Sequence, residues 1–295
     1  MMSKRFTDWL IFIVLSLIWG SSFILMKIGL QQLNSYQVAA LRIFSAGLIL
    51  LPITIKNIKY IPKNKLSLVF LSGLIGNLIP AFLFCIAEEK IDSGLAGTLN
   101  SLTPIFVIVT GYIFFNIQTT TNKVIGILIA FIGSFLLLFS TSNLQGDMHF
   151  NLILLVILAT LLYGFNVNMV AKKLSNITSL HIAAVALSLN AIPALLILIF
   201  TGYFNLPLNN KAFLISTGAS VLLGVLGTAI ATIIFYMLVK RAGGVFATMV
   251  TYGIPFIAIG WGIIYGESFG WQQAFCLLII LSGVYYSNRK IRNKK

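Results

Sequence analysis

Residues 99–115 read LNSLTPIFVIVTGYIFF, and residues 250–266 read VTYGIPFIAIGWGIIYG. Each segment begins with polar or small residues, continues with a proline and an apolar run, and has a glycine seven residues after the proline. The two prolines, Pro104 and Pro255, are 151 residues apart, which is about half of the 295-residue chain. A broken apolar segment that occurs twice at this separation points to an internal duplication.

The composition indicates that the outside of the molecule faces lipid. The chain is 59% hydrophobic and 9% charged, whereas a soluble domain is about a quarter charged. Its apolar runs have the length of a membrane-spanning helix, about 20 residues, and they lack the alternation of a membrane barrel. The sequence therefore predicts an all-α polytopic membrane protein with ten transmembrane helices, at about 9–29, 36–55, 66–87, 93–115, 123–140, 151–170, 178–200, 212–239, 244–265 and 271–288.

The net charge of +14 follows the topology of the predicted helices. If the N-terminus is inside, the inner segments hold sixteen of the twenty Lys and Arg residues, whereas the outer connections hold Lys90 and Lys211. An excess of basic residues in cytoplasmic loops is the usual pattern of membrane proteins. The pattern predicts a multi-pass protein of the cytoplasmic (inner) membrane with both termini in the cytoplasm, and the charge needs no nucleic-acid partner.

An internal repeat organises the helices. With the same offset of 151 residues, segment 71–113 matches segment 222–264, including glycines 73 and 76 against 224 and 227. The earlier helices align at an offset of 144, where Trp19 and Gly20 correspond to Tyr163 and Gly164. The chain is then two five-helix halves, 1–145 and 146–295. Because five is odd, the halves are inverted in the membrane, an architecture that many secondary transporters share.

The chain resembles the EamA-type branch of the drug/metabolite transporter superfamily along nearly its whole length. The resemblance rests on LIWGSSFILMK at 17–27, ALRIFSAGLIL at 40–50, SGLAGTLNSLTPIFVIVTGYIF at 93–114 and GIIYGESFGWQQAFCLLIILSGV at 262–284. It implies two inverted five-helix repeats around a central cavity, and export of small metabolites such as amino acids. In the family, each repeat tends to end its fourth helix with a glutamate; Glu267 matches this pattern, but Asn116 occupies the first-half position.

Two cations within the predicted helices are candidate substrate ligands. A charged side chain in a membrane helix is costly and often functional. Lys27 lies near the outer end of the first helix, where it either extends to the headgroups or faces the cavity, and the family pattern also has a lysine here. Arg42 offers a planar fork of donors that suits a carboxylate. Its partner is either a substrate or an acidic residue on the same side, namely Glu88, Glu89, Asp92 or Glu267.

Polar side chains near the broken segments predict the wall of the cavity. Asn77, Asn100 and Asn166 lie within apolar helices, and Thr228 and Thr251 are the repeat partners of the first two. Each either joins neighbouring helices or lines a cavity. Pro104 and Pro255 break the helical hydrogen bonding beside them, and such irregular backbone is tolerated where it faces water or protein.

Large aromatic side chains form a further candidate group. Trp19, Tyr163, Tyr252 and Trp261 lie within the predicted helices. They serve either packing or the binding of an apolar substrate.

The sequence favours a secondary transporter over a membrane enzyme or a channel-like subunit. The chain has two His and six acidic residues without a clustered motif, whereas acid–base and metal chemistry needs such groups close together. It also lacks the glycine-rich phosphate loop of an ATPase. We therefore predict no catalytic residue, cofactor or metal. The predicted partners are a small-molecule substrate and the lipid bilayer, while a monomer and a homodimer both stay open, as do the substrate, direction and energy coupling.

Overall fold

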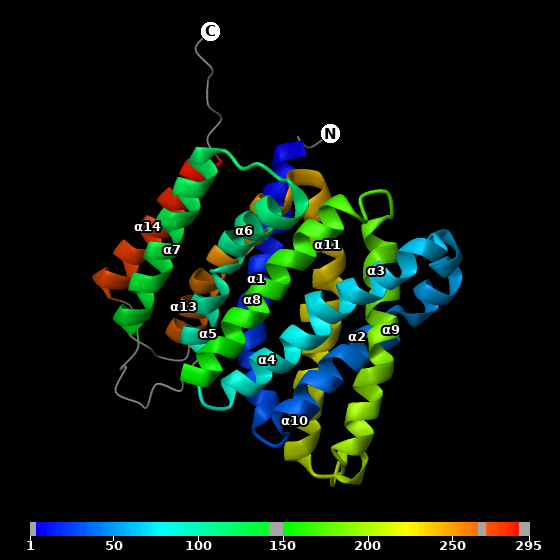
Figure 1. Cartoon of the computed structure of the whole chain (residues 1–295). Helices are drawn as coiled ribbons and strands as arrows, with labels where there is room; N and C mark the ends of the chain where they lie inside the picture. Colours follow the sequence, from blue (N-terminus) through cyan, green and yellow to red (C-terminus); the bar gives the residue numbers. More distant parts are fainter. Residues whose placement is uncertain (1–3, 92, 142–149, 265–269, 289–295) are drawn as a thin grey trace.

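The computed structural model describes residues 4–91, 93–141, 150–264 and 270–288, and these residues are almost entirely helical (Figure 1). Helices of the first half are α1 (Lys4–Leu30), α2 (Ser35–Asn57), α3 (Lys63–Gly73), α4 (Ile79–Glu88), α5 (Ser93–Asn100), α6 (Thr103–Phe115) and α7 (Thr121–Thr141). Helices of the second half are α8 (Phe150–Lys172), α9 (Ser179–Phe200), α10 (Lys211–Leu222), α11 (Ala231–Ala242), α12 (Gly244–Thr248), α13 (Ile254–Ile264) and α14 (Trp271–Ser287).

These elements form the ten predicted membrane-spanning segments. Eight helical stretches are long and apolar enough to cross a bilayer, and α7 and α14 complete the set. The outer faces carry exposed apolar side chains such as Phe139, Phe200 and Leu278. In water these would be unfavourable, but in a bilayer they face hydrocarbon. The predicted all-α polytopic fold is confirmed.

Matching irregularities in the two halves show the repeat. Short π-helical turns interrupt the third span at Leu74–Leu78 (η2) and the eighth span at Leu223–Ile230 (η4). The fourth span breaks between α5 and α6, and the ninth span breaks at a 3₁₀ turn, Met249–Tyr252 (η5). Each pair is related by the offset of about 151 residues that the sequence predicts. A π-helical turn inside an α-helix is uncommon and often marks a functional site.

The two halves interlock rather than lie as separate bundles. Helix α2 packs along α9, α6 along α8, and α7 antiparallel to α14, which places these last two side by side at one edge of the molecule (Figure 1). At the α2–α9 contact, Gly47 lies against Ala191, its partner at the offset of 144 residues. A residue that touches its own repeat partner lies near the pseudo-two-fold axis, so this axis runs between α2 and α9.

The connections and the ends also fit the inverted arrangement. Asn34 caps the N-terminus of α2 by accepting from Gln37 N at 2.9 Å, and Thr178, 144 residues later, caps α9 by accepting from His181 N at 3.3 Å. Helix α1 begins and α14 ends at the same end of the molecule (Figure 1), as ten spans require. At this end Arg241 Nε donates to Asp8 Oδ1 at 2.7 Å and so joins α11 to α1.

Candidate functional site

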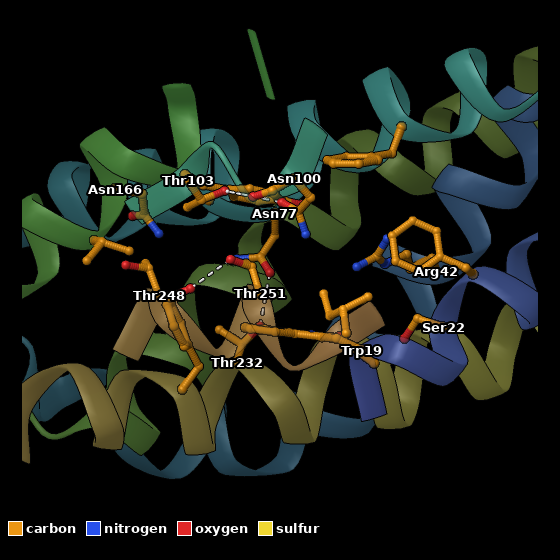
Figure 2. A pocket seen from close by; sticks show the side chains of 18 of the residues that line it. Trp19, Ser22, Arg42, Asn77, Asn100, Thr103, Asn166, Thr232, Thr248 and Thr251 are labelled. Atoms are coloured by element: carbon orange, nitrogen blue, oxygen red, sulfur yellow. Dashed lines mark hydrogen bonds between the residues drawn. The ribbon is translucent and has the colours of Figure 1, made fainter. Parts of the chain in front are cut away.

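A cavity of about 100 Å³ lies between the two halves, beside the π-helical turns and the helix breaks. Figure 2 shows side chains from both halves directed toward it, with Asn77 and Asn100 on one side and Trp19 on the other. Its lining residues are Trp19, Ser22, Phe23, Met26, Arg42, Gly76, Asn77, Phe84, Asn100, Thr103, Tyr163, Asn166, Val167, Gly227, Thr232, Phe235, Tyr236, Thr248, Thr251 and Ile254.

Arg42 enters this cavity from α2 of the first half, and a residue of the second half orients it. Its Nε donates to Thr228 Oγ1 at 2.7 Å. Thr228 is buried in η4, behind the lining. Within the described residues no carboxylate lies within 4 Å of the Arg42 guanidinium. The ion pair among these residues joins Asp8 to Arg241 instead. Of the four acidic partners considered for Arg42, Asp92 and Glu267 lie outside the described residues.

An aromatic wall covers another side of the cavity. Trp19 Nε1 donates to the carbonyl oxygen of Gly227 at 3.0 Å, so the first helix is tied to the π-helical turn η4. Its indole ring meets Phe235 edge-on, with the ring centroids 5.1 Å apart. Across the repeat, Tyr163 stacks on Phe84 at 6.1 Å. These rings give the site an apolar surface beside its polar groups.

A buried hydrogen-bond network includes two of the lining residues, Asn166 and Tyr236. Asn166 Nδ2 donates to the hydroxyl oxygen of Tyr236 at 3.0 Å, and Asn166 Oδ1 accepts from Ser72 Oγ at 2.8 Å. The hydroxyl groups of Ser72 and Tyr236 are themselves 3.0 Å apart. The three residues come from α8, α3 and α11, so the network joins both halves. Such a fully satisfied network fixes the relative position of its helices.

The remaining polar residues lie at the helix breaks. Thr103 Oγ1 donates to the backbone oxygen of Asn100 at 2.8 Å; Pro104 has no N–H to give this oxygen. Thr251 Oγ1 donates to the carbonyl oxygen of Thr248 at 3.0 Å. Asn77 Oδ1 accepts from Thr232 Oγ1 at 3.0 Å, whereas Asn77 Nδ2 is buried without a hydrogen bond of ordinary length and lies near the hydroxyl group of Tyr236.

Both prolines stand at the start of a helix rather than in the middle of one. Pro104 is the second residue of α6, and Pro255 is the second residue of α13. The first N–H groups of a helix have no intrahelical partner, so a proline costs little there. The prolines thus begin the second part of each broken span, at the level of the cavity.

Seven of the eleven residues that the sequence predicts as substrate ligands line the cavity: Trp19, Arg42, Asn77, Asn100, Tyr163, Asn166 and Thr251. Thr228 supports Arg42 from behind. Lys27 is exposed near the end of α1 and is not among the lining residues, although its neighbour Met26 is. Tyr252 donates to the carbonyl oxygen of Ile127 at 3.0 Å, and Trp261 Nε1 donates to Ser21 Oγ at 2.9 Å.

Sequence reasoning missed several lining residues. The repeat itself could have found Ser22, because the offset of 144 pairs it with Asn166. Tyr236 and Thr232 carried a weaker signal, as polar groups in an apolar helix. The aliphatic and phenylalanine side chains gave none, since they look like any other lipid-facing or core residue of these helices.

The glutamate pattern of the family differs between the halves. Asn116 follows α6 in a left-handed conformation with φ of 51° and ends that helix. A left-handed asparagine is a common helix stop. Its counterpart Glu267 lies outside the described residues. Within the part of the chain that the structure describes, no three His, Cys, Asp or Glu side chains gather as metal ligands would.

Known proteins share both the sequence pattern and the fold. A model of the EamA-like transporter family matches residues 7–139 and 151–289. An uncharacterized transporter of Archaeoglobus fulgidus is 26% identical over 289 residues, covering 96% of this chain and 99% of its own. Protein PagO of Salmonella typhimurium is 22% identical, covering 94% and 91%.

Two further proteins are similar to part of the sequence or to the fold. The uncharacterized inner membrane transporter YedA of Escherichia coli K12 is 28% identical over 135 residues, which is 45% of this chain and 44% of YedA. A chain of known crystal structure superposes with a TM-score of 0.72 at 16% identity, over 96% of both chains. At this identity the likeness shows the fold alone.

Proposed function

The chain belongs to the EamA-like transporter family, a family of non-enzymatic membrane transporters, and from this premise we propose that it exports amino acids or related small metabolites by alternating access. The observation that carries the proposal is the cavity between the two halves, at the point where both are irregular. Secondary transporters with inverted repeats bind their substrates at such a place.

The shape of the cavity wall supports alternating access. Halves 1–145 and 146–295 both contribute lining residues, so a movement of one half against the other would change which side of the cavity opens. Both broken spans contribute lining residues, namely Asn100 and Thr103 from the first half and Thr248 and Thr251 from the second. We propose that Trp19, Arg42, Asn77, Asn100, Tyr163, Asn166 and Thr251 contact the substrate.

The charge pattern supports a location in the cytoplasmic membrane with both termini inside. The basic residues concentrate in the segments that an inside N-terminus places in the cytoplasm, as the usual charge rule requires. Helix α1 begins and α14 ends on one side (Figure 1). The relative YedA carries an inner-membrane description in its name.

Counterflow in proteoliposomes tests the transport mechanism. Vesicles loaded with an unlabelled amino acid or related metabolite receive the same compound in labelled form outside, across a panel of compounds. A carrier with one alternately exposed site gives saturable uptake that the internal substrate accelerates. Flux that rises linearly with concentration would instead indicate a channel, and no flux of any panel member would remove the proposed substrate class.

A matched pair of tryptophan variants tests the location of the site. Trp19 lines the cavity, whereas Trp271 is 78% exposed at the start of α14. We expect Trp19→Ala to weaken saturable exchange strongly and Trp271→Ala to leave it at the wild-type level. Equal effects of the two substitutions would place the substrate elsewhere. Thermal unfolding of both purified variants separates lost transport from lost stability.

A further inference from the structure

We propose that the substrate is bound as a carboxylate, held by the guanidinium of Arg42, and that its amino group is not a recognised feature. This inference rests on the proposed function and names the chemical class of its substrate. It follows from the charge of the cavity, from the orientation of Arg42, and from a buried amide donor of Asn77 that lines the same cavity.

The cavity carries a positive charge that its described lining does not neutralise. Arg42 is the charged side chain among the described lining residues, and Asp and Glu are absent from that set. The described ion pair of the chain, Asp8–Arg241, lies at another level. An isolated cation in a membrane interior is costly, and a bound anion reduces that cost. An occupant with a negative group is therefore favoured over a neutral or cationic one.

The orientation of Arg42 leaves the terminal nitrogen atoms of its guanidinium group available to a ligand. Nε–H is engaged by Thr228 Oγ1 at 2.7 Å, and Thr228 is 1% exposed in the second half. The terminal nitrogen atoms of the guanidinium have no partner among the described residues. Two parallel N–H donors on a planar fork match the two oxygen atoms of a carboxylate. Thr228 thus acts as a positioning residue.

Asn77 supplies a second, independent indication. Its side chain is 9% exposed and lines the same cavity (Figure 2). Oδ1 accepts from Thr232, so the amide is oriented with Nδ2 left over; this buried donor makes no hydrogen bond of ordinary length, and the acceptor near the amide is the hydroxyl group of Tyr236. A buried donor without a hydrogen bond of ordinary length is unfavourable. A carboxylate oxygen would satisfy it, while an ammonium group, which is itself only a donor, would not.

The other lining residues indicate the chemistry of the part of the substrate beyond its carboxylate. Phe23, Phe84, Phe235, Met26 and Ile254 give an apolar wall. The cavity volume of about 100 Å³ favours a small substrate. Without a carboxylate among the described lining residues, a substrate ammonium finds no ionic partner there. A small carboxylate with an apolar tail fits the site better than the corresponding amine.

Glu88 is the competing explanation for the charge of Arg42. This carboxylate is buried at the end of α4, its Oε2 accepts from Ser93 Oγ at 3.3 Å, and its Oε1 has no partner. It lies outside the lining and more than 4 Å from the guanidinium. If Arg42 serves to compensate Glu88 rather than to bind a ligand, removing both charges together would restore what removing Arg42 alone destroys.

Ligand-induced thermal stabilisation of the purified full-length protein tests the inference. The probes share one apolar tail: 4-methylpentanoate has only the carboxylate, 3-methylbutylamine only the amine, leucine both, and 4-methylpentanamide a neutral amide of the same shape. A series of carboxylates with tails from methyl to phenyl, each with its matched amide, covers other sizes. We expect carboxylates to stabilise the wild type at lower concentrations than their amides, and the amine to have no effect.

Substitutions at the two donors sharpen the test. Arg42→Gln should weaken carboxylate binding by roughly 30-fold or more, as loss of one member of a buried charge pair does. Arg42→Lys keeps the charge but not the fork, so its loss should be smaller. Asn77→Asp places a competing carboxylate in the cavity and should weaken carboxylates while allowing the amine to bind. Lys211→Gln, an exposed charge at the start of α10, is the matched control.

Each outcome decides for or against the carboxylate. Amides that bind as well as carboxylates, an amine that binds as well, or an Arg42→Gln variant with unchanged affinity would each overturn it. Recovery of binding in an Arg42→Gln/Glu88→Gln double variant would show that Arg42 compensates the charge of Glu88 rather than binding the substrate. Counterflow distinguishes the two proposals. Exchange of an amine alone would support the transport function and contradict carboxylate recognition. Binding of carboxylates without any exchange would support carboxylate recognition and contradict the transport function.

Discussion

Replacement of Gly47 by alanine tests the interlocked contact between α2 and α9. A Cβ atom at this position would come 2.5 Å from the carbonyl oxygen of Leu187 and 2.6 Å from Cβ of Ala191. Ordinary carbon contacts are about 3.5–4.0 Å, so the two helices must separate by about 1 Å. The carbonyl oxygen of Gly47 also accepts from Ser188 Oγ at 3.0 Å across this contact, and the separation strains that bond as well.

The expected cost follows from other overpacked interiors, about 1–3 kcal/mol. A change of 1 kcal/mol shifts the unfolding temperature of a chain of 150–250 residues by roughly 2–4 °C, so Gly47→Ala should lower the melting temperature by several degrees. Gly218→Ala is the matched control. It lies in α10 with nothing within 4 Å of its added Cβ atom, and alanine in a helix should stabilise slightly.

The assay is thermal unfolding of the purified protein, with both variants at the same concentration and in the same detergent. A Gly47→Ala variant that melts at or above the wild-type temperature would refute the close approach of α2 and α9. Equal destabilisation by Gly218→Ala would show that the effect belongs to any added methyl group. Either result would remove the evidence that the repeat axis runs through this contact.

Three further perturbations have defined outcomes. Tyr236→Phe removes a buried hydroxyl with two partners and should cost about 1–3 kcal/mol in thermal unfolding, whereas Tyr285→Phe at an exposed position should be neutral; equal effects would contradict the network. Asp8→Asn leaves Arg241, 35% exposed, without its partner, and we expect a stability loss of at most about 1 kcal/mol. If α1 and α11 separate during transport, the loss of this ion pair should change the counterflow rate, and an unchanged rate would argue that they do not separate. Lys240→Met removes donation to the carbonyl oxygen atoms of residues 174, 175 and 177 and should lower the melting temperature, so an unchanged value would show that water replaces the ammonium group.

Much of the fold could be predicted from particular residues. Pro104 and Pro255 indicated the repeat because each interrupts the hydrogen bonding of an apolar helix. An apolar composition alone does not explain two such interruptions at matching positions. The π-helical turns η2 and η4 could not be predicted, because a wider hydrogen-bond pattern leaves no period in an apolar sequence. The glycines at 73, 76, 224 and 227 were visible, but close helix packing would explain them equally well.

The site was predictable only in its polar part. Asn77, Asn100 and Asn166 stand out because an amide is expensive in an apolar helix. Trp19 and Trp261 are indistinguishable in sequence, and only the neighbouring helices decide that the first lines the cavity while the second bonds to Ser21. The orientation of the Asn77 amide depends on one hydrogen bond from Thr232, 155 residues away, which no local pattern contains.

Two-sided accessibility of a single cysteine tests alternating access most directly. Ser22 lines the cavity, and Ser22→Cys changes one atom; Cys85 and Cys276 are both buried and are replaced by alanine in the same protein. A membrane-impermeant thiol reagent is then added to right-side-out and to inside-out vesicles that hold an ion gradient. We predict labelling from both faces while the gradient persists. Labelling from one face only, or labelling from both with loss of the gradient, would contradict the account.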